Sequence, residues 1–258
     1  MARVPIALEL YSVRVDLKND PRGTLQRVAA MGYEGVEFAG FPLPAEELRS
    51  IIDEVGLVAC SSHTGIDQVQ DNTLDQTIAF NKIIGNNSLI IPGLPGHWTG
   101  SKENWLKTAG FFNALAEKLA KHGMWTGYHN HHTEFTPIDG AETAWDVFFG
   151  NTSAAVVTQL DTGNALCGGG DSVQLLSKYP GRARSIHLKP YSESAGKVSH
   201  EEGFKPIIGE DDIPWSSVFN ICETIGKTEW YIVEYESDAY PSMEAVERCL
   251  KALKAMGK

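Results

Sequence analysis

A chain of 258 residues is long enough for one α/β barrel, and its 42% hydrophobic content supplies a large core, which excludes a disordered protein. The formal net charge of -11 would repel nucleic-acid phosphates, and no Lys or Arg cluster overrides it, so we exclude nucleic acid as a partner. No apolar run approaches the roughly 18 residues needed to cross a bilayer, which excludes a membrane-spanning protein.

Short apolar runs alternate with longer segments of helical period along the whole chain. The predicted strands are residues 6–11, 35–38, 58–62, 88–92, 125–131, 155–161, 185–189 and 231–234. The predicted helices are residues 21–31, 44–55, 74–84, 102–122, 141–149, 172–178, 215–225 and 242–256. Asp20 as an N-cap and Pro21 at the first helical position mark the start of the first helix, and Gly56 is typical of a helix C-cap.

Eight strand–helix units in order, without a break in composition, predict a single closed (β/α)8 TIM barrel domain over residues 1–258. A doubly wound nucleotide-binding fold would carry a Gly-rich fingerprint after its first strand, where this chain has Tyr11-Ser12-Val13-Arg14. The glycine run 168–170 lacks the lysine of a P-loop, so we interpret it as a flexible connector. Residues 190–212 are too long for a plain connection, and we predict a lid or binding loop there.

The cysteines lie far apart, with no CxxC pair among them: Cys60, Cys167, Cys222 and Cys249. This spacing indicates reduced thiols that pack in the interior, not a disulfide framework. The N-terminus runs directly into a strand-like segment and leaves no room for the apolar core of a signal peptide. We therefore expect a cytoplasmic protein, and a homo-oligomer is compatible with the sequence.

Polar side chains gather at the C-terminal ends of the predicted strands, where the active site of such a barrel lies. The ring consists of Glu9, Glu37, His63, His129, His131, Asp161, His187, Lys189, Glu234 and Glu236. Buried carboxylates and imidazoles are costly unless they are paired or bound to metal, so a ring of them indicates a site. His129 and His131 alternate along one predicted strand and should share a face.

Four consecutive strands each offer one donor for a divalent metal: His129, Asp161, His187 and Glu234. Nitrogen and carboxylate donors without cysteine suit Mn²⁺, Zn²⁺, Co²⁺ or Fe²⁺ better than Ca²⁺. Each residue also has a structural interpretation, with Asp161 as a helix N-cap, Glu234 as a partner of Lys189 and His187 as a core histidine. The structural interpretation of all four would require four coincidences on one rim.

Six stretches are informative as a set: Leu10-Tyr11-Ser12-Val13-Arg14, Gly32-Tyr33-Glu34-Gly35-Val36-Glu37-Phe38, Tyr128-His129-Asn130-His131, Leu160-Asp161-Thr162-Gly163-Asn164-Ala165, Ile186-His187-Leu188-Lys189 and Ile208-Gly209-Glu210-Asp211-Asp212-Ile213-Pro214-Trp215. Together they resemble the sugar phosphate isomerase/epimerase family, a branch of the xylose isomerase-like barrels, over nearly the whole chain. The resemblance implies a divalent ion held by side chains of the last four strands, with Asp161, His187 and Glu234 on the family's ligand positions.

The chain departs from many relatives at three positions. His129 stands where many of them carry a glutamate, and Asn164 stands where a substrate-contacting histidine often follows the aspartate. Pro190 follows Lys189 where relatives frequently read HxKD.

The resemblance implies a metal-dependent sugar isomerase or epimerase, in which the ion binds two adjacent substrate oxygens and stabilises an enediolate. We expect Glu234 to act as a base and Lys189 to stabilise negative charge. Because His129 cannot supply a second carboxylate, the second proton-transfer group is expected among His131, His63 and Glu37.

Further substrate contacts are predicted at Glu37 and Asn164, at Trp98 in the loop after the fourth strand, and at Glu210 in the long loop. The absence of an Arg–Lys cluster favours a sugar without phosphate. One alternative is a lyase that cleaves 3-keto-glycosides by β-elimination after the same enolisation. Another is a barrel that only binds sugar, which the presence of all four ligand types argues against.

Overall fold

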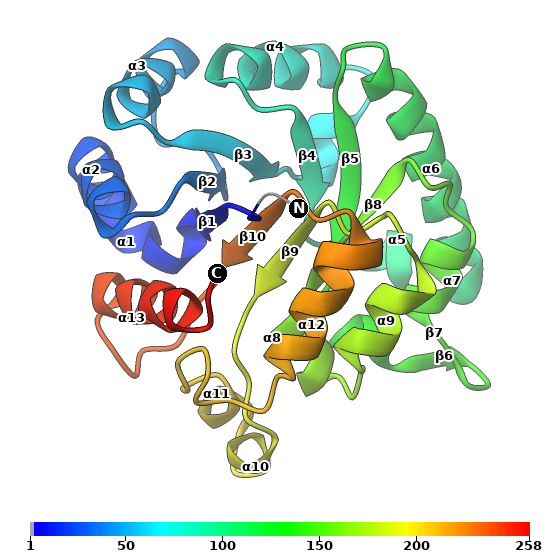
Figure 1. Cartoon of the computed structure of the whole chain (residues 1–258). Coiled ribbons are helices and arrows are strands. Elements are labelled where there is room, and N and C mark those ends of the chain that lie inside the picture. Colours follow the sequence, from blue (N-terminus) through cyan, green and yellow to red (C-terminus); the bar gives the residue numbers. More distant parts are fainter. Residues whose placement is uncertain (1–2) are drawn as a thin grey trace.

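The computed structural model describes residues 3–258, which form a closed barrel of parallel strands in the order β1-β10-β9-β8-β5-β4-β3-β2 (Figure 1). The barrel strands are β1 (Ile6–Glu9), β2 (Gly35–Phe38), β3 (Val58–His63), β4 (Ser88–Ile91), β5 (Trp125–His129), β8 (Val156–Asp161), β9 (Ser185–Leu188) and β10 (Trp230–Val233). This confirms the predicted TIM barrel.

Helices surround the barrel in Figure 1. The longer ones are α2 (Pro21–Met31), α3 (Ala45–Val55), α4 (Leu74–Ile84), α6 (Lys102–Ala120), α7 (Ala144–Gly150), α9 (Ser172–Lys178), α12 (Trp215–Ile221) and α13 (Ser242–Ala255). Short elements fill the connections: η1 (Leu10–Val13), α1 (Arg14–Asn19), η2 (Ile66–Val69), α5 (Gly96–Thr99), η3 (Thr133–Phe135), α8 (Thr162–Cys167), α10 (Glu193–Gly196), α11 (His200–Gly203) and η4 (Cys222–Gly226). No described helix is long and apolar enough to cross a membrane.

The predicted helix signals act as expected at the start of α2. The Asp20 side chain accepts a hydrogen bond from the Gly23 N–H at 2.9 Å, and Pro21 occupies the first turn. Gly32 ends the helix in the left-handed region with φ of 99°, where a residue without a Cβ is favoured.

The fifth strand ends two residues earlier than predicted, at His129. The Asn130 side chain explains this difference, because its Oδ1 accepts from the Asp161 N–H at 2.9 Å and its Nδ2 donates to the Asp161 carbonyl at 3.2 Å. The side chain thus takes the place that the backbone would hold in a continued ladder. His131 therefore lies beyond the strand, but it still lines the same cavity as His129.

Three connections also differ from the predictions. Residues 190–212 contain the short helices α10 and α11, and a two-stranded hairpin of β6 (Pro137–Asp139) and β7 (Glu142–Thr143) precedes α7. Gly168 is closely packed, since a Cβ there would lie 2.4 Å from the His132 carbonyl oxygen. Its interpretation as part of a flexible connector is therefore wrong.

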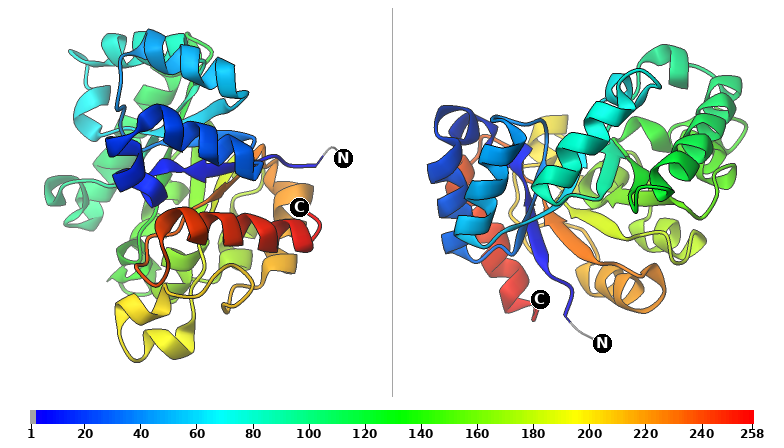
Figure 2. Two further views of the ribbon diagram at one scale, coloured as in Figure 1. Left: turned by 90° about the vertical axis from the view of Figure 1, so that its left-hand side faces the viewer. Right: turned by 90° about the horizontal axis from the view of Figure 1, so that it is seen from above.

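The inward-facing positions change from apolar to polar along the strands. Small clusters of buried apolar residues lie early in the strands, including Ala7, Ile232 and Val157, and the next inward positions are Glu9, Glu234 and Gln159. Figure 2 shows α5 and α10–α11 on the side of the barrel away from the two termini. The barrel therefore presents its polar side chains at one end, the end at which its strands finish.

Arg182 joins the start of β8 to α7 from inside the fold. Its guanidinium is buried and donates to the carbonyl oxygens of Val156 at 2.9 Å and Phe149 at 3.1 Å, and to Thr152 Oγ1 at 2.7 Å. Burial lowers the pKa of Arg182 to about 10. The side chain stabilises the fold by satisfying several buried acceptors at once.

We predict that Arg182→Ala lowers the free energy of unfolding by about 3 kcal/mol, because buried carbonyl groups lose their donors. Arg184→Ala is the matched control, since Arg184 pairs with Glu229 near the surface and should lose about 1 kcal/mol or less. Urea unfolding with an unchanged slope measures both values, and equal losses in the two variants would contradict this role of Arg182.

Candidate functional site

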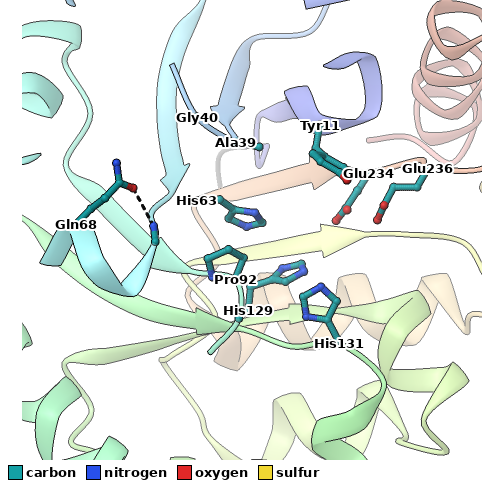
Figure 3. Close-up of a pocket in the computed structure, with 12 residues that line it drawn as sticks. Tyr11, Ala39, Gly40, His63, Gln68, Pro92, His129, His131, Glu234 and Glu236 are labelled. Carbon is teal, nitrogen blue, oxygen red and sulfur yellow. Dashed lines mark hydrogen bonds between the residues drawn. The ribbon is translucent and has the colours of Figure 1, made fainter. Parts of the chain in front are cut away.

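A cavity of about 480 Å³ opens at the C-terminal ends of the strands (Figure 3). Its lining comes from several strand ends and loops: Tyr11, Ala39, Gly40, His63, Gly65, Gln68, Pro92, Gly93, His129, His131, Glu234 and Glu236. None of these residues is a lysine or an arginine. In Figure 3 the carboxylates of Glu234 and Glu236 lie side by side, and His129 and His131 face them across the cavity.

The four predicted metal-binding residues converge at the inner end of this cavity. His129 ends β5, Asp161 ends β8, His187 lies in β9 and Glu234 follows β10. Each offers one ligand atom, and these atoms all lie within 4.8 Å of one another. All four side chains are buried, so the donors are held by the barrel and not by mobile loops.

The two oxygens of Asp161 have different surroundings. Oδ1 accepts the Asn164 N–H at 2.6 Å and caps α8, as the structural interpretation predicted. Oδ2 is buried without a hydrogen-bond partner and lies 4.0 Å from both His129 Nε2 and Lys189 Nζ. Burial raises the pKa of Asp161 to about 7, although Lys189 acts in the opposite direction. Oδ1 therefore stabilises the fold by capping α8, and Oδ2 remains available to bind a ligand.

Both ring nitrogens of His187 contact carboxylates. Nδ1 lies 2.6 Å from Glu234 Oε2, and Nε2 lies 2.5 Å from Glu37 Oε1. Burial by itself lowers the pKa of His187, but the two carboxylates outweigh burial and raise it to about 10. Glu37 thus orients the ring from the side opposite Glu234, as outer carboxylates do for liganding histidines.

A buried polar network supports Glu37 from the other side. His63 Nε2 lies 3.1 Å from Glu37 Oε1 and 2.9 Å from Gln159 Oε1, and the Gln159 amide donates to Glu37 Oε2 at 2.8 Å. Burial raises the pKa of Glu37, but the nearby His63 and His187 outweigh it and hold the pKa well below its usual range. We did not single out Gln159 from the sequence, although its position two residues before Asp161 places it on the same strand face.

Glu9 lies beside Glu37 inside the barrel. Its Oε1 accepts the Tyr11 N–H at 3.2 Å, and its Oε2 is buried without a partner. Burial and the charge of Glu37 raise the pKa of Glu9 well above its usual value. Glu9 therefore caps the turn after β1 and does not line the cavity.

Lys189 joins the Glu234 and Glu236 carboxylates of this cavity and itself lines a second, adjoining cavity. Its Nζ lies 3.3 Å from Glu234 Oε1 and donates to Glu236 Oε1. Burial lowers the pKa of Lys189, but Glu234, Asp161 and Glu236 outweigh burial and raise it. Glu236 belonged to the predicted polar ring but not to the predicted catalytic set, although its spacing from Glu234 placed both on one side of the chain.

His129 and His131 differ in their electrostatic surroundings. Burial and the neighbouring His187 and His63 lower the pKa of His129 well below its usual value, which leaves a neutral imidazole. Burial also lowers the pKa of His131, although Glu134 acts in the opposite direction. The His131 backbone N–H donates to Glu134 Oε2 at 2.8 Å and fixes the chain at the cavity edge.

The predicted substrate contacts lie in four different places. Glu37 is covered by the histidines, and Asn164 lines a second cavity beside Lys189. Trp98 packs against Phe111 of α6 with ring centroids 5.0 Å apart, outside the lining of the first cavity. Glu210 contacts Arg248 of α13 at 3.4 Å, so the structure does not bring it to the site.

The donor set fits a divalent ion. It combines two imidazoles with two carboxylates, one ring is neutral, and the unpaired Asp161 Oδ2 points into the cluster. Without a cation, this oxygen remains buried without compensation, which is unfavourable. Oxygen and nitrogen donors of this kind suit Zn²⁺, Mn²⁺, Co²⁺ and Fe²⁺.

A family model described as "Xylose isomerase-like TIM barrel" matches residues 25–256. An inosose dehydratase from Erwinia tasmaniensis is 28% identical over 253 residues, which cover 86% of this chain and 84% of that protein. An inosose dehydratase from Geobacillus thermodenitrificans is 30% identical over 149 residues, which cover 54% of this chain and 49% of that protein.

Solved structures share the fold. A sugar phosphate isomerase/epimerase from Parabacteroides distasonis superposes with a TM-score of 0.80 at 24% identity, covering 99% of this chain and 95% of that chain. The IOLI protein, whose crystal structure holds a zinc atom, superposes with a TM-score of 0.74 at 13% identity, covering 97% of each chain.

We predict that Asp161→Asn weakens binding of a divalent ion about 100-fold or more. Loss of a residue that only hydrogen-bonds to a metal ligand already lowers metal affinity by up to about 100-fold, and Asp161 is itself a candidate ligand. Asp146→Asn is the control, since Asp146 pairs with Lys178 on the outside of the barrel and should leave binding unchanged. Equilibrium dialysis with metal analysis measures the affinity, which should also fall as imidazoles take up protons at lower pH. Equal affinities for the two variants would exclude Asp161 as a ligand.

Proposed function

Because this chain belongs to the xylose isomerase-like TIM barrel family, we propose that it is a metal-dependent lyase acting on a polyhydroxylated cyclic ketone. The reaction removes the proton next to the carbonyl and expels the oxygen substituent one carbon further on. Keto-cyclitols and keto-sugars have this arrangement of groups. The names of its curated relatives, which are dehydratases, support a lyase over an isomerase.

The distribution of acid–base groups around the cavity is the observation that carries the proposal. Glu234 and Glu236 form one wall, and Lys189, which lines the adjoining second cavity, is hydrogen-bonded to both of them. The imidazoles of His129 and His131 form the facing wall. Elimination from one face of a substrate needs a base and a proton donor on the same side. The pair of Glu234 and Lys189, at 3.3 Å, provides both.

His129, Asp161, His187 and Glu234 are the residues that would hold the metal ion. A divalent ion at this position supplies Lewis acidity that polarises the substrate carbonyl and stabilises negative charge on its oxygen. Glu37 holds the His187 ring, and the Asn164 N–H holds Asp161, so the protein fixes the donors before substrate arrives.

Glu234 and Lys189 carry out all the proton transfers of the proposed elimination. Glu234 accepts the proton from the carbon next to the carbonyl, and the electron pair of that C–H bond forms the new C=C bond as the C–O bond breaks. The leaving oxygen takes a proton from the Lys189 ammonium, because a departing hydroxide is more basic than an amine. Lys189 regains a proton from Glu234, so the net loss is one water, or one alcohol from a glycoside. Glu236 positions the Lys189 ammonium throughout.

The isomerase interpretation uses the same enolisation but a different second step. An epimerase returns a proton to the opposite face, and His131 on the facing wall is the group that could supply it. The mass of the product separates the two reactions, since an isomerase leaves the mass unchanged. For the lyase, the His131 imidazole binds a substrate hydroxyl group instead.

We predict that the purified protein with Mn²⁺ or Zn²⁺ converts a keto-cyclitol or a 3-keto-glycoside to an unsaturated ketone, with loss of water or free alcohol measured by mass spectrometry. Lys189→Met should lower this rate about 100-fold or more, because the leaving group loses its proton donor. The same variant should still exchange the substrate proton for deuterium, since Glu234 remains. Glu234→Gln should lose both activities.

Lys118→Met is the matched control, because Lys118 pairs with the exposed Asp71 on the outside of the barrel. Metal content is measured for every variant so that a lost ion is not mistaken for a lost proton donor. A product of unchanged mass and altered configuration would replace the lyase by an isomerase. Substrate binding without exchange or elimination would indicate a barrel that only binds sugar.

A further inference from the structure

A second group of metal-binding side chains lies outside the candidate metal centre. It consists of His132, Cys167 and His200, and we call it the His132–Cys167–His200 cluster. One ligand atom from each residue lies within 4.8 Å of the other two. The cluster shares no residue with the group of His129, Asp161, His187 and Glu234.

Three separate parts of the fold bring the cluster together. His132 follows β5, Cys167 ends α8, and His200 begins α11 in the segment 190–212. Close packing holds the first two parts, since a Cβ at Gly168 would lie 2.4 Å from the His132 carbonyl oxygen. The rings of His132 and His200 have centroids 5.0 Å apart.

The segment 190–212 is compact around Tyr191. A Cβ at Gly196 would lie 2.1 Å from the Tyr191 hydroxyl, and a Cβ at Gly203 would lie 2.3 Å from its ring, so both helices pack directly on this side chain. Tyr191 also contacts Cys167, and burial together with this contact raises the pKa of Tyr191 to about 12. The segment therefore meets the barrel at the cysteine of the cluster.

The donor chemistry of the cluster differs from that of the candidate metal centre. A thiolate with two imidazoles suits zinc and other thiophilic ions, whereas carboxylates and imidazoles accept a wider range of metals. Zinc sites with three protein ligands keep a fourth position for water. Cys167 is half-buried and His200 is exposed, so an ion can reach the cluster from solvent.

We propose that the His132–Cys167–His200 cluster binds one zinc ion and fastens the segment 190–212 to the barrel beside the cavity. Binding converts the Cys167 thiol to a thiolate, and its proton leaves to solvent. The ion then links the loop after β5 to α8 and α11. The ring centroid of Phe204, in the same segment, lies 5.1 Å from the ring centroid of His200 and 5.3 Å from Lys189 Nζ. This link therefore also holds Phe204 in place beside Lys189.

Cobalt titration of the full-length protein in reducing buffer tests the site, because only a sulfur ligand gives a thiolate-to-cobalt charge-transfer band in the near ultraviolet. We expect this band in the wild-type protein and in Asp161→Asn, which removes a donor only from the carboxylate-containing centre. We expect Cys167→Ser and His200→Ala to lose the band. His97→Ala, which changes another exposed histidine, should keep it.

A second measurement follows the segment itself. Zinc should slow tryptic cleavage after Lys197, which precedes the 80% exposed Val198, and it should have no such effect in Cys167→Ser. The proposal is overturned if wild-type protein shows no charge-transfer band, or if the band persists in Cys167→Ser. It is also overturned if zinc protects the wild type and Cys167→Ser equally.

Discussion

The contact of His187 with Glu37 on one ring nitrogen and Glu234 on the other is the constraint on which the site depends. These carboxylates lie inside a barrel, where an uncompensated charge would cost several kcal/mol. The single imidazole compensates both and ties three strands of the barrel at their ends. The barrel therefore tolerates a polar upper layer because most of its charges are paired, and Asp161 Oδ2 is the carboxylate oxygen of the metal-ligand group at which the pairing is incomplete. A cation at that point would complete it.

The same charges divide the cavity into two walls with different chemistry. Lys189 keeps Glu234 and Glu236 together at the end of β10, so the carboxylates act from one direction on whatever occupies the cavity. The end of β5 carries the imidazole of His129 and no carboxylate, which leaves the facing wall without a strong base. This asymmetry is a physical reason why the proposed elimination, which uses one face of the substrate, suits this cavity better than a proton transfer between faces.

The barrel and the four converging donors could be predicted because both follow from local patterns. Strand periodicity and helix caps mark the elements, and the fold then places every strand end on one rim. The end of β5 could not be predicted, because it depends on the Asn130 side chain meeting Asp161 far along the chain. The position of Glu210 beside Arg248, and the meeting of His132 with Cys167 and His200, likewise depend on how distant connections pack. Such contacts have no signature in local sequence.

The glycines near the cavity determine at which positions a substitution can change the shape of the cavity. A side chain at Gly127 would press on the Val157 carbonyl at 2.4 Å, and one at Gly163 would press on the Lys189 carbonyl at 2.9 Å, so both positions are closed to variation. Gly93 also lines the cavity, but a Cβ there would meet nothing within 4 Å. A mutant library that changes substrate preference can therefore start at position 93, where bulk enters the cavity without disturbing the strands that hold the donors.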